Sequence, residues 1–171
     1  TGVVAQNLRE LRDRLYSVHP SSIYYHFWGA FLRPGFEEPE YNNDFANWAH
    51  DSLHDLSLAE RLSVLEPPNY SDLESLREEL IDVIEERLYE SEIVPWAKPD
   101  QAFHFIRGII VVFDTGMRVE RPGELTSILP QMSNSSLYYH FIDARRRPPE
   151  GIDDFRAWLS GFGETYQALT D

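Results

Sequence analysis

Two copies of a short aromatic motif contain the residues of this sequence best suited to chemistry. "SSIYYHF" begins at Ser21 and "SSLYYHF" begins at Ser135, and an Asp-Phe pair and a tryptophan follow each copy. Histidine can change its charge near neutral pH, and an aspartate can orient its ring. Aromatic side chains add apolar surface with polar tips. The candidate ligand-binding residues are therefore Tyr24, His26, Asp44, Trp48, Tyr138, His140, Asp154 and Trp158.

The same residues also have a structural interpretation. Successive helical residues are rotated by about 100°, so Tyr24, Tyr25 and His26 cannot all face one way. Some of them must pack in a core, where hydroxyl and imidazole groups hydrogen-bond to neighbouring helix ends. We rank this structural role first, a ligand pocket second and catalysis third.

A second candidate site is the pair His50 and His54 in "HDSLH". Residues four apart share a helix face, and such a pair can bind one zinc ion. A metal-dependent hydrolase that uses this pair, with His26 nearby, is our alternative function. Zinc proteases have glutamate where this sequence has Asp51, and no third ligand is evident downstream. Histidines that face solvent are the simpler explanation.

The aromatic motifs lie in an internal duplication. Residues 1–27 align without gaps with residues 115–141, and "NDFANW" then aligns with "DDFRAW". Chance does not produce matches in one order over this length. The sequence predicts a single domain, 1–171, with repeat one at 1–54, a helical insertion at 55–101 and repeat two at 102–168. The identical pairs are Thr1/Thr115, Gly2/Gly116, Glu10/Glu124, Leu11/Leu125, Leu15/Leu129, Ser21/Ser135, Ser22/Ser136, Tyr24/Tyr138, Tyr25/Tyr139, His26/His140, Phe27/Phe141, Asp44/Asp154, Phe45/Phe155 and Trp48/Trp158.

Helical periodicity dominates the pattern of apolar residues. Asn7 and Glu10 are suited to cap a first helix, Ser21 or Ser22 a second, and Asp44 a third. We therefore expect an α+β fold, mainly α, in which two pseudo-symmetric repeats share a small β element.

The expected β element is the β-branched and aromatic segment Ala102–Phe113. Because this strand feeds the Thr-Gly turn of repeat two, we expect its partner to lie upstream of residue 1. Without that partner, the exposed strand edge could recruit a second copy into a homo-oligomer.

Composition excludes several classes of protein. The net charge of −14 repels phosphate backbones, so no nucleic-acid partner is expected. The chain has no cysteine and no long apolar run, so we expect a cytoplasmic protein without a membrane span. Nucleotide-binding and serine-hydrolase motifs are not recognisable, and no cofactor is expected unless His50 and His54 bind a divalent metal.

The strings "SSIYYHFWG", "YNNDFANWAH", "FDTG" and "LYYHFIDARRR" resemble a family of short prokaryotic proteins of unknown function. Genes of that family often lie beside those of trehalose-synthase-type glycosyltransferases. The resemblance implies an accessory role in carbohydrate metabolism and assigns no catalytic residue. We therefore expect a non-enzymatic binding or accessory module whose partner is a protein or a small polar or sugar ligand.

Overall fold

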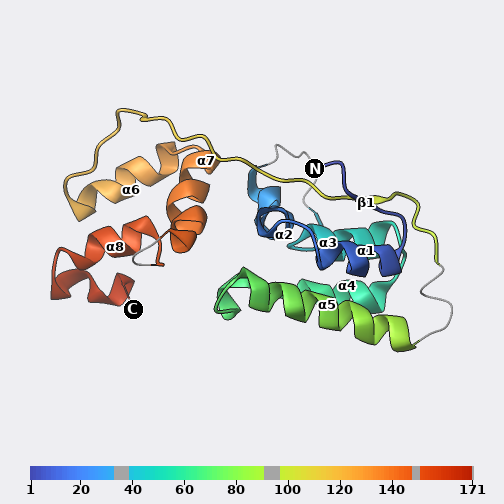
Figure 1. Cartoon of the computed structure of the whole chain (residues 1–171). Helices are drawn as coiled ribbons and strands as arrows, with labels where there is room; N and C mark the ends of the chain where they lie inside the picture. Colours follow the sequence, from blue (N-terminus) through green and yellow to red (C-terminus); the bar gives the residue numbers. More distant parts are fainter. Residues whose placement is uncertain (33–38, 91–96, 148–150, 171) are drawn as a thin grey trace. The chain divides into compact units, whose positions relative to one another are not determined.

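The structure, a computed structural model, describes residues 1–32, 39–90, 97–147 and 151–170. The chain divides into two compact units, Thr1–Ile110 and Val111–Asp171 (Figure 1). Helices dominate both units, and the first contains a two-stranded sheet. The predicted fold class, α+β and mainly α with a small β element, is confirmed. The duplication of the two halves stays a prediction.

The first unit contains five α-helices in its described part. None of the described helices of the chain combines the length and the apolar character that a membrane crossing requires. The elements of the unit are β1 (Val4–Ala5), α1 (Leu8–Leu15), α2 (Pro20–Trp28), a 3₁₀ turn (Gly29–Leu32), α3 (Asp44–Asp51), α4 (Leu56–Ser63), a 3₁₀ turn (Pro67–Asn69), α5 (Leu73–Glu90) and β2 (Phe103–His104).

Side-chain caps fix where the first two helices begin. The Asn7 side chain accepts a hydrogen bond from the Glu10 amide, and the Glu10 carboxylate accepts one from the Gln6 amide, as predicted. The start of α2 differs from the prediction, because His19 caps it instead of Ser21 or Ser22. Proline is well suited to the first helical position, and Pro20 in that position leaves His19 as the cap.

The predicted strand 102–113 is much shorter in the structure. Only Phe103–His104 is a strand, and it pairs antiparallel with Val4–Ala5. Phe103–His104 thus has a partner within the first five residues, and a strand upstream of residue 1 stays a prediction. Gly2 has a φ of 78°, a left-handed conformation that suits glycine, and it turns the chain so that residues 3–5 run beside 103–105.

The rest of that segment is exposed. In the stretch Ile-Ile-Val-Val-Phe at 109–113, Ile109 is 82% exposed and Phe113 is 79% exposed. The apolar composition that predicted a strand therefore does not lead to burial here. Whether this stretch mediates self-association stays a prediction.

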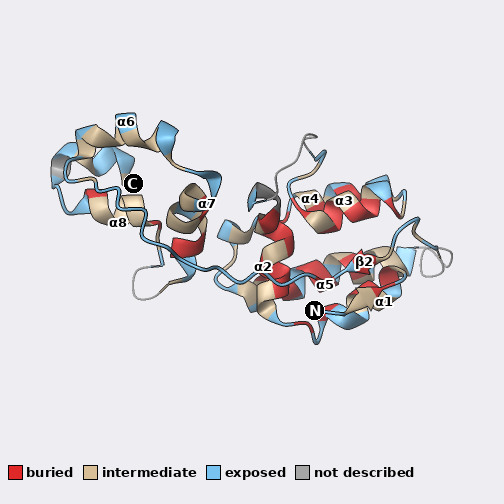
Figure 2. Ribbon diagram, turned by 90° about the horizontal axis from the view of Figure 1, so that it is seen from above, coloured by how far each residue is buried: buried red, intermediate tan, exposed pale blue. Residues whose placement is uncertain are grey.

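Phe103 lies at the centre of an aromatic cluster in the core of the first unit. Its ring stacks on Phe45 at 5.1 Å between centroids, and it contacts His26 at 4.7 Å and Trp48 at 5.6 Å. Leucines from α1, α4 and α5 surround this cluster and are fully buried. Buried residues therefore follow the inward faces of the helices of this unit (Figure 2).

The second unit consists of short helical segments. Its elements are a 3₁₀ turn (Pro122–Glu124), α6 (Leu125–Ile128), a 3₁₀ turn (Leu129–Gln131), α7 (Asn134–Leu137), a π-helical turn (Tyr138–Ile142), a 3₁₀ turn (Asp143–Arg146), α8 (Asp154–Ser160) and a 3₁₀ turn (Glu164–Leu169). Most residues of α6, α7 and α8 are half-buried or exposed (Figure 2).

Replacing Phe103 tests whether its ring holds the first unit together. We expect Phe103→Ala to lower the free energy of unfolding by about 3–5 kcal/mol, because it leaves a cavity in a packed core. Urea unfolding followed by circular dichroism measures the change. The control is Phe113→Ala, whose exposed ring should contribute less than about 0.5 kcal/mol. Equal effects of the two substitutions would contradict this core.

Candidate functional site

In the first unit, α3 brings an aspartate to the histidine of α2. Asn43 caps α3 by accepting a hydrogen bond from the Ala46 amide, so the predicted cap, Asp44, is instead the first helical residue. The Asp44 carboxylate therefore points to His26, whose Nδ1 lies 2.8 Å from Asp44 Oδ2. A buried asparagine thus performs the capping, and the charged neighbour orients the histidine.

His26 uses both of its ring nitrogens. The Ile106 N–H donates to Nε2 at 3.0 Å, so Nε2 is an acceptor and Nδ1 carries the proton that Asp44 accepts. Ser22 Oγ donates to the Ile106 carbonyl at 2.6 Å. The two side chains, four residues apart on one helix face, together bind both polar groups of Ile106.

The other two candidates of the first unit also lie inside it. Trp48 is 7% exposed, and its indole N–H donates to the Gln101 carbonyl at 2.7 Å. Tyr24 is 6% exposed and His26 is 2% exposed. Trp48 and His26 therefore contact residues 101–106 of their own chain, which we call the 101–106 segment. All three side chains are too buried to be accessible to an external ligand.

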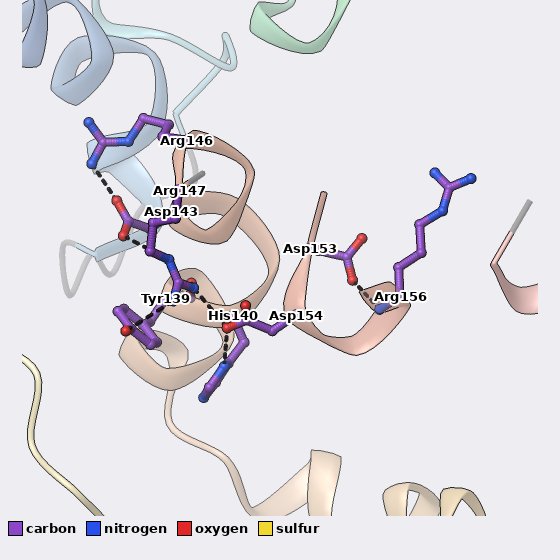
Figure 3. Close-up of polar contacts among 8 residues, drawn as sticks. All are labelled: Tyr139, His140, Asp143, Arg146, Arg147, Asp153, Asp154 and Arg156. Atoms are coloured by element: carbon purple, nitrogen blue, oxygen red, sulfur yellow. Dashed lines mark hydrogen bonds and ion pairs between the residues drawn. The ribbon is translucent and has the colours of Figure 1, made fainter. Parts of the chain in front are cut away.

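The second unit brings together the matching histidine and aspartate. Asp153 caps α8 by accepting a hydrogen bond from the Arg156 amide, and Asp154 is the first helical residue (Figure 3). Nδ1 of His140 lies 2.7 Å from Asp154 Oδ2. Capping residue and paired aspartate are thus arranged as in the first unit.

Arg147 adds a positive charge to this pair (Figure 3). Its guanidinium donates to Asp154 Oδ2 at 2.7 Å and lies over the ring of Tyr139, 4.2 Å from the ring centroid. Burial alone would lower the pKa of Arg147, but the hydrogen bond and the charge of Asp154 outweigh it and raise the pKa. Asp154 Oδ2 thus contacts both the Arg147 guanidinium and Nδ1 of His140, which fixes the orientation of the His140 ring.

His140 lies at the edge of a cavity of about 450 Å³ within the second unit. We call the cavity the His140 groove. Seven of its thirteen lining residues are apolar, and they come from α6, from α8 and from the segments on either side of α6. The groove is lined by Thr115, Met117, Val119, Leu125, Ile128, Gln131, Met132, Ser133, Ser136, His140, Asp154, Phe155 and Trp158.

Residues of the groove are more exposed than their counterparts in the first unit. Phe155 and Trp158 are half-buried, whereas Phe45 is fully buried and Trp48 is 7% exposed. The His140 side chain is 38% exposed. Tyr138 differs from these residues, because it is buried at 5% exposure. The groove therefore presents three of the four predicted residues of the second copy to solvent.

Comparisons with known proteins identify the family. The model of a family described as "Family of unknown function (DUF5752)" matches residues 1–171. The chain belongs to this family. This chain is similar to the solved structure of OrfY from Thermoproteus tenax, with a TM-score of 0.78 and 28% sequence identity. The match covers 99% of this chain and 76% of the OrfY chain. A comparison with curated proteins finds no match.

The candidate metal-binding pair, His50 and His54, does not lie on one helix face in the structure. Helix α3 ends at Asp51, and His54 has a left-handed φ of 54°. The hydrogen bond to Asp51 raises the pKa of His50, although burial opposes it. Metal binding by His50 and His54 stays a prediction. No group of three metal-ligating side chains is found among the described residues.

Three residues that the sequence interpretation did not select contribute to the second site. Ser136 and Phe155 line the groove, and Arg147 pairs with Asp154. Ser136 and Phe155 could have been found, since both are identical between the aligned halves. Arg147 could not, because it lies in a loop whose path depends on contacts across the unit.

The two histidines should differ in their effect on stability. We expect His26→Ala to lower the free energy of unfolding by about 3 kcal/mol, because the buried imidazole leaves a cavity, the part-buried Ile106 N–H loses its acceptor and Asp44 loses a donor. His140→Ala, the matched control, should cost less than about 1 kcal/mol because the pair is partly exposed. Urea unfolding measures both changes. An equal or larger cost for His140→Ala would contradict these assignments.

Proposed function

We propose that this protein is a non-enzymatic binding module and that its ligand binds in the His140 groove. One observation carries the proposal. Side chains that match between the aligned halves contact the 101–106 segment in the first unit and line an open groove in the second. A volume of about 450 Å³ is within the range of ligand sites.

The hydrogen bonds of the first unit support binding rather than catalysis. Ser136, His140 and Asp154 are residue types that also form hydrolase triads, in which the serine donates to the histidine. In the first unit, however, Ser22 donates to a backbone carbonyl and His26 accepts from a backbone N–H. Side chains in this arrangement hold a peptide group and do not attack it.

The wall of the groove favours a largely apolar ligand over a sugar. Its apolar lining residues include Met117, Leu125, Ile128, Met132 and Phe155. Sugars carry many hydroxyl groups that need partners when they are buried. A sugar ligand and a role in carbohydrate metabolism therefore depend on the resemblance of the sequence alone.

A fluorescent apolar probe tests the groove. We expect N-phenyl-1-naphthylamine to bind the wild-type protein with one saturable site, because the wall is apolar and accessible. Ser136→Trp should abolish this binding by filling the groove. The control is Ser135→Trp on the neighbouring exposed residue, which should leave binding unchanged. Fluorescence titration measures both variants, and circular dichroism verifies that they fold.

Two results would contradict the proposal. One is unchanged probe binding by Ser136→Trp, which would place the apolar site elsewhere. The other is saturable binding of maltose, but not of the apolar probe, that Ser136→Trp abolishes; this would make the groove a sugar site.

A further inference from the structure

The first unit shows how side chains of this kind hold an extended segment of polypeptide. Phe103 and Phe105 of the 101–106 segment are buried, whereas His104 between them is exposed. This alternation is that of a strand with one buried face. The segment joins the fold at the sheet edge formed by β1, where the Phe105 amide donates to the Val3 carbonyl at 3.0 Å.

Polar contacts to this segment are made to its backbone. Ser22 and His26 bind the carbonyl and the amide of Ile106, and the Trp48 indole binds the Gln101 carbonyl. Backbone groups are the same in every peptide, so these contacts select an extended conformation rather than a sequence. A preference for an aromatic side chain comes from the rings of Phe45, His26 and Trp48, which surround Phe103.

The second unit presents matching donors and acceptors. Ser136 Oγ, His140 Nε2 and Trp158 Nε1 have no hydrogen-bond partner in the described part of the chain. All three residues line the same groove. Asp154 Oδ2 lies 2.7 Å from Nδ1 of His140 and accepts a hydrogen bond from it, which leaves Nε2 as the nitrogen that faces a ligand, as it faces Ile106 in His26.

The segment beside which a strand would add also has its counterpart, although residues 115–119 form no strand in the structure. Gly116 has a φ of 72°, close to the 78° of Gly2, so the chain has a similar left-handed residue before each of the two segments. Thr115, Met117 and Val119 then line the groove, as residues 1–5 flank the 101–106 segment.

We propose that the His140 groove binds an extended polypeptide strand with aromatic side chains at alternate positions, in the way that the first unit holds its 101–106 segment. The strand would pair antiparallel with Thr115–Val119. Ser136 and His140 would bind one of its peptide groups, and Phe155 and Trp158 would receive an aromatic ring. This inference rests on the proposed binding function and names the class of ligand.

Charge and shape agree with such a partner. His140 and Asp154 are the titratable side chains of the groove lining, and Arg147 balances the Asp154 carboxylate. A site of this kind offers no cation for a phosphate or carboxylate ligand, whereas a neutral peptide backbone needs none. Backbone pairing of an extended peptide with its receptor is a recurring mode of peptide recognition, and here residues 115–119 would become a strand only on binding.

The chain supplies the probe for a direct test. A capped synthetic peptide, Asp100–Gly108 (DQAFHFIRG), should bind the intact protein with 1:1 stoichiometry in isothermal titration calorimetry. We expect His140→Ala to weaken binding about 10-fold through the loss of one hydrogen bond to the ring. Ser136→Trp should abolish it, and Ser135→Trp should leave it unchanged.

Modified peptides separate recognition of the backbone from apolar adhesion. Methylation of the backbone nitrogen of the residue that matches Ile106 removes the N–H that His140 accepts and should weaken binding about 10-fold. The same methylation at the terminal glycine is the control. Serine in place of the first phenylalanine should also weaken binding, because the aromatic pocket is then not filled.

Three results would overturn this inference. They are no peptide binding, binding that persists in Ser136→Trp, and equal affinity of the two methylated peptides. If the peptide does not bind while N-phenyl-1-naphthylamine still binds in the groove, the strand proposal is wrong and the proposed binding function stands. If the apolar probe also fails to bind there, both are wrong.

Discussion

The first unit depends on one imidazole ring whose two nitrogens both have partners. His26 donates to Asp44 and accepts from the amide of Ile106, and the faces and edges of its ring contact Phe45 and Phe103. These contacts join α2, α3 and the 101–106 segment, which are far apart in the sequence. A doubly protonated ring would direct a second N–H at the amide of Ile106, so the arrangement requires the neutral form.

Local patterns predicted the positions of the first three helices, since caps and apolar periodicity act over a few residues, but the caps of α2 and α3 lie one to three residues before the predicted ones. Asn7 and Glu10 illustrate this success. The pairing of β1 with β2 could not be found in this way, because it joins residues about 100 positions apart and depends on the turn at Gly2. The expectation that His54 shares a helix face with His50 assumed that α3 continues past Asp51, and in the structure the helix ends there.

The predicted site residues include both histidine–aspartate pairs, and each pair forms within its own unit. Their different environments could not be read from identical residue types. Burial of His26 comes from a segment supplied by the same unit, whereas the groove at His140 stays open. An open groove leaves apolar surface in water, so the second unit gains less hydrophobic stabilisation than the first. The open groove is thus obtained at the expense of stability.

The exposed stretch at 109–113 has a consequence for how the protein behaves at high concentration. Five uncharged, β-prone residues without proline have the composition of segments that stack into amyloid fibrils. Arg107 precedes the stretch, and the ion pair of Asp114 with Arg118 follows it. Charges in these flanking positions act as gatekeepers against aggregation. Together with the net charge of −14, they keep neighbouring molecules apart, so salt that screens this repulsion would favour fibril formation.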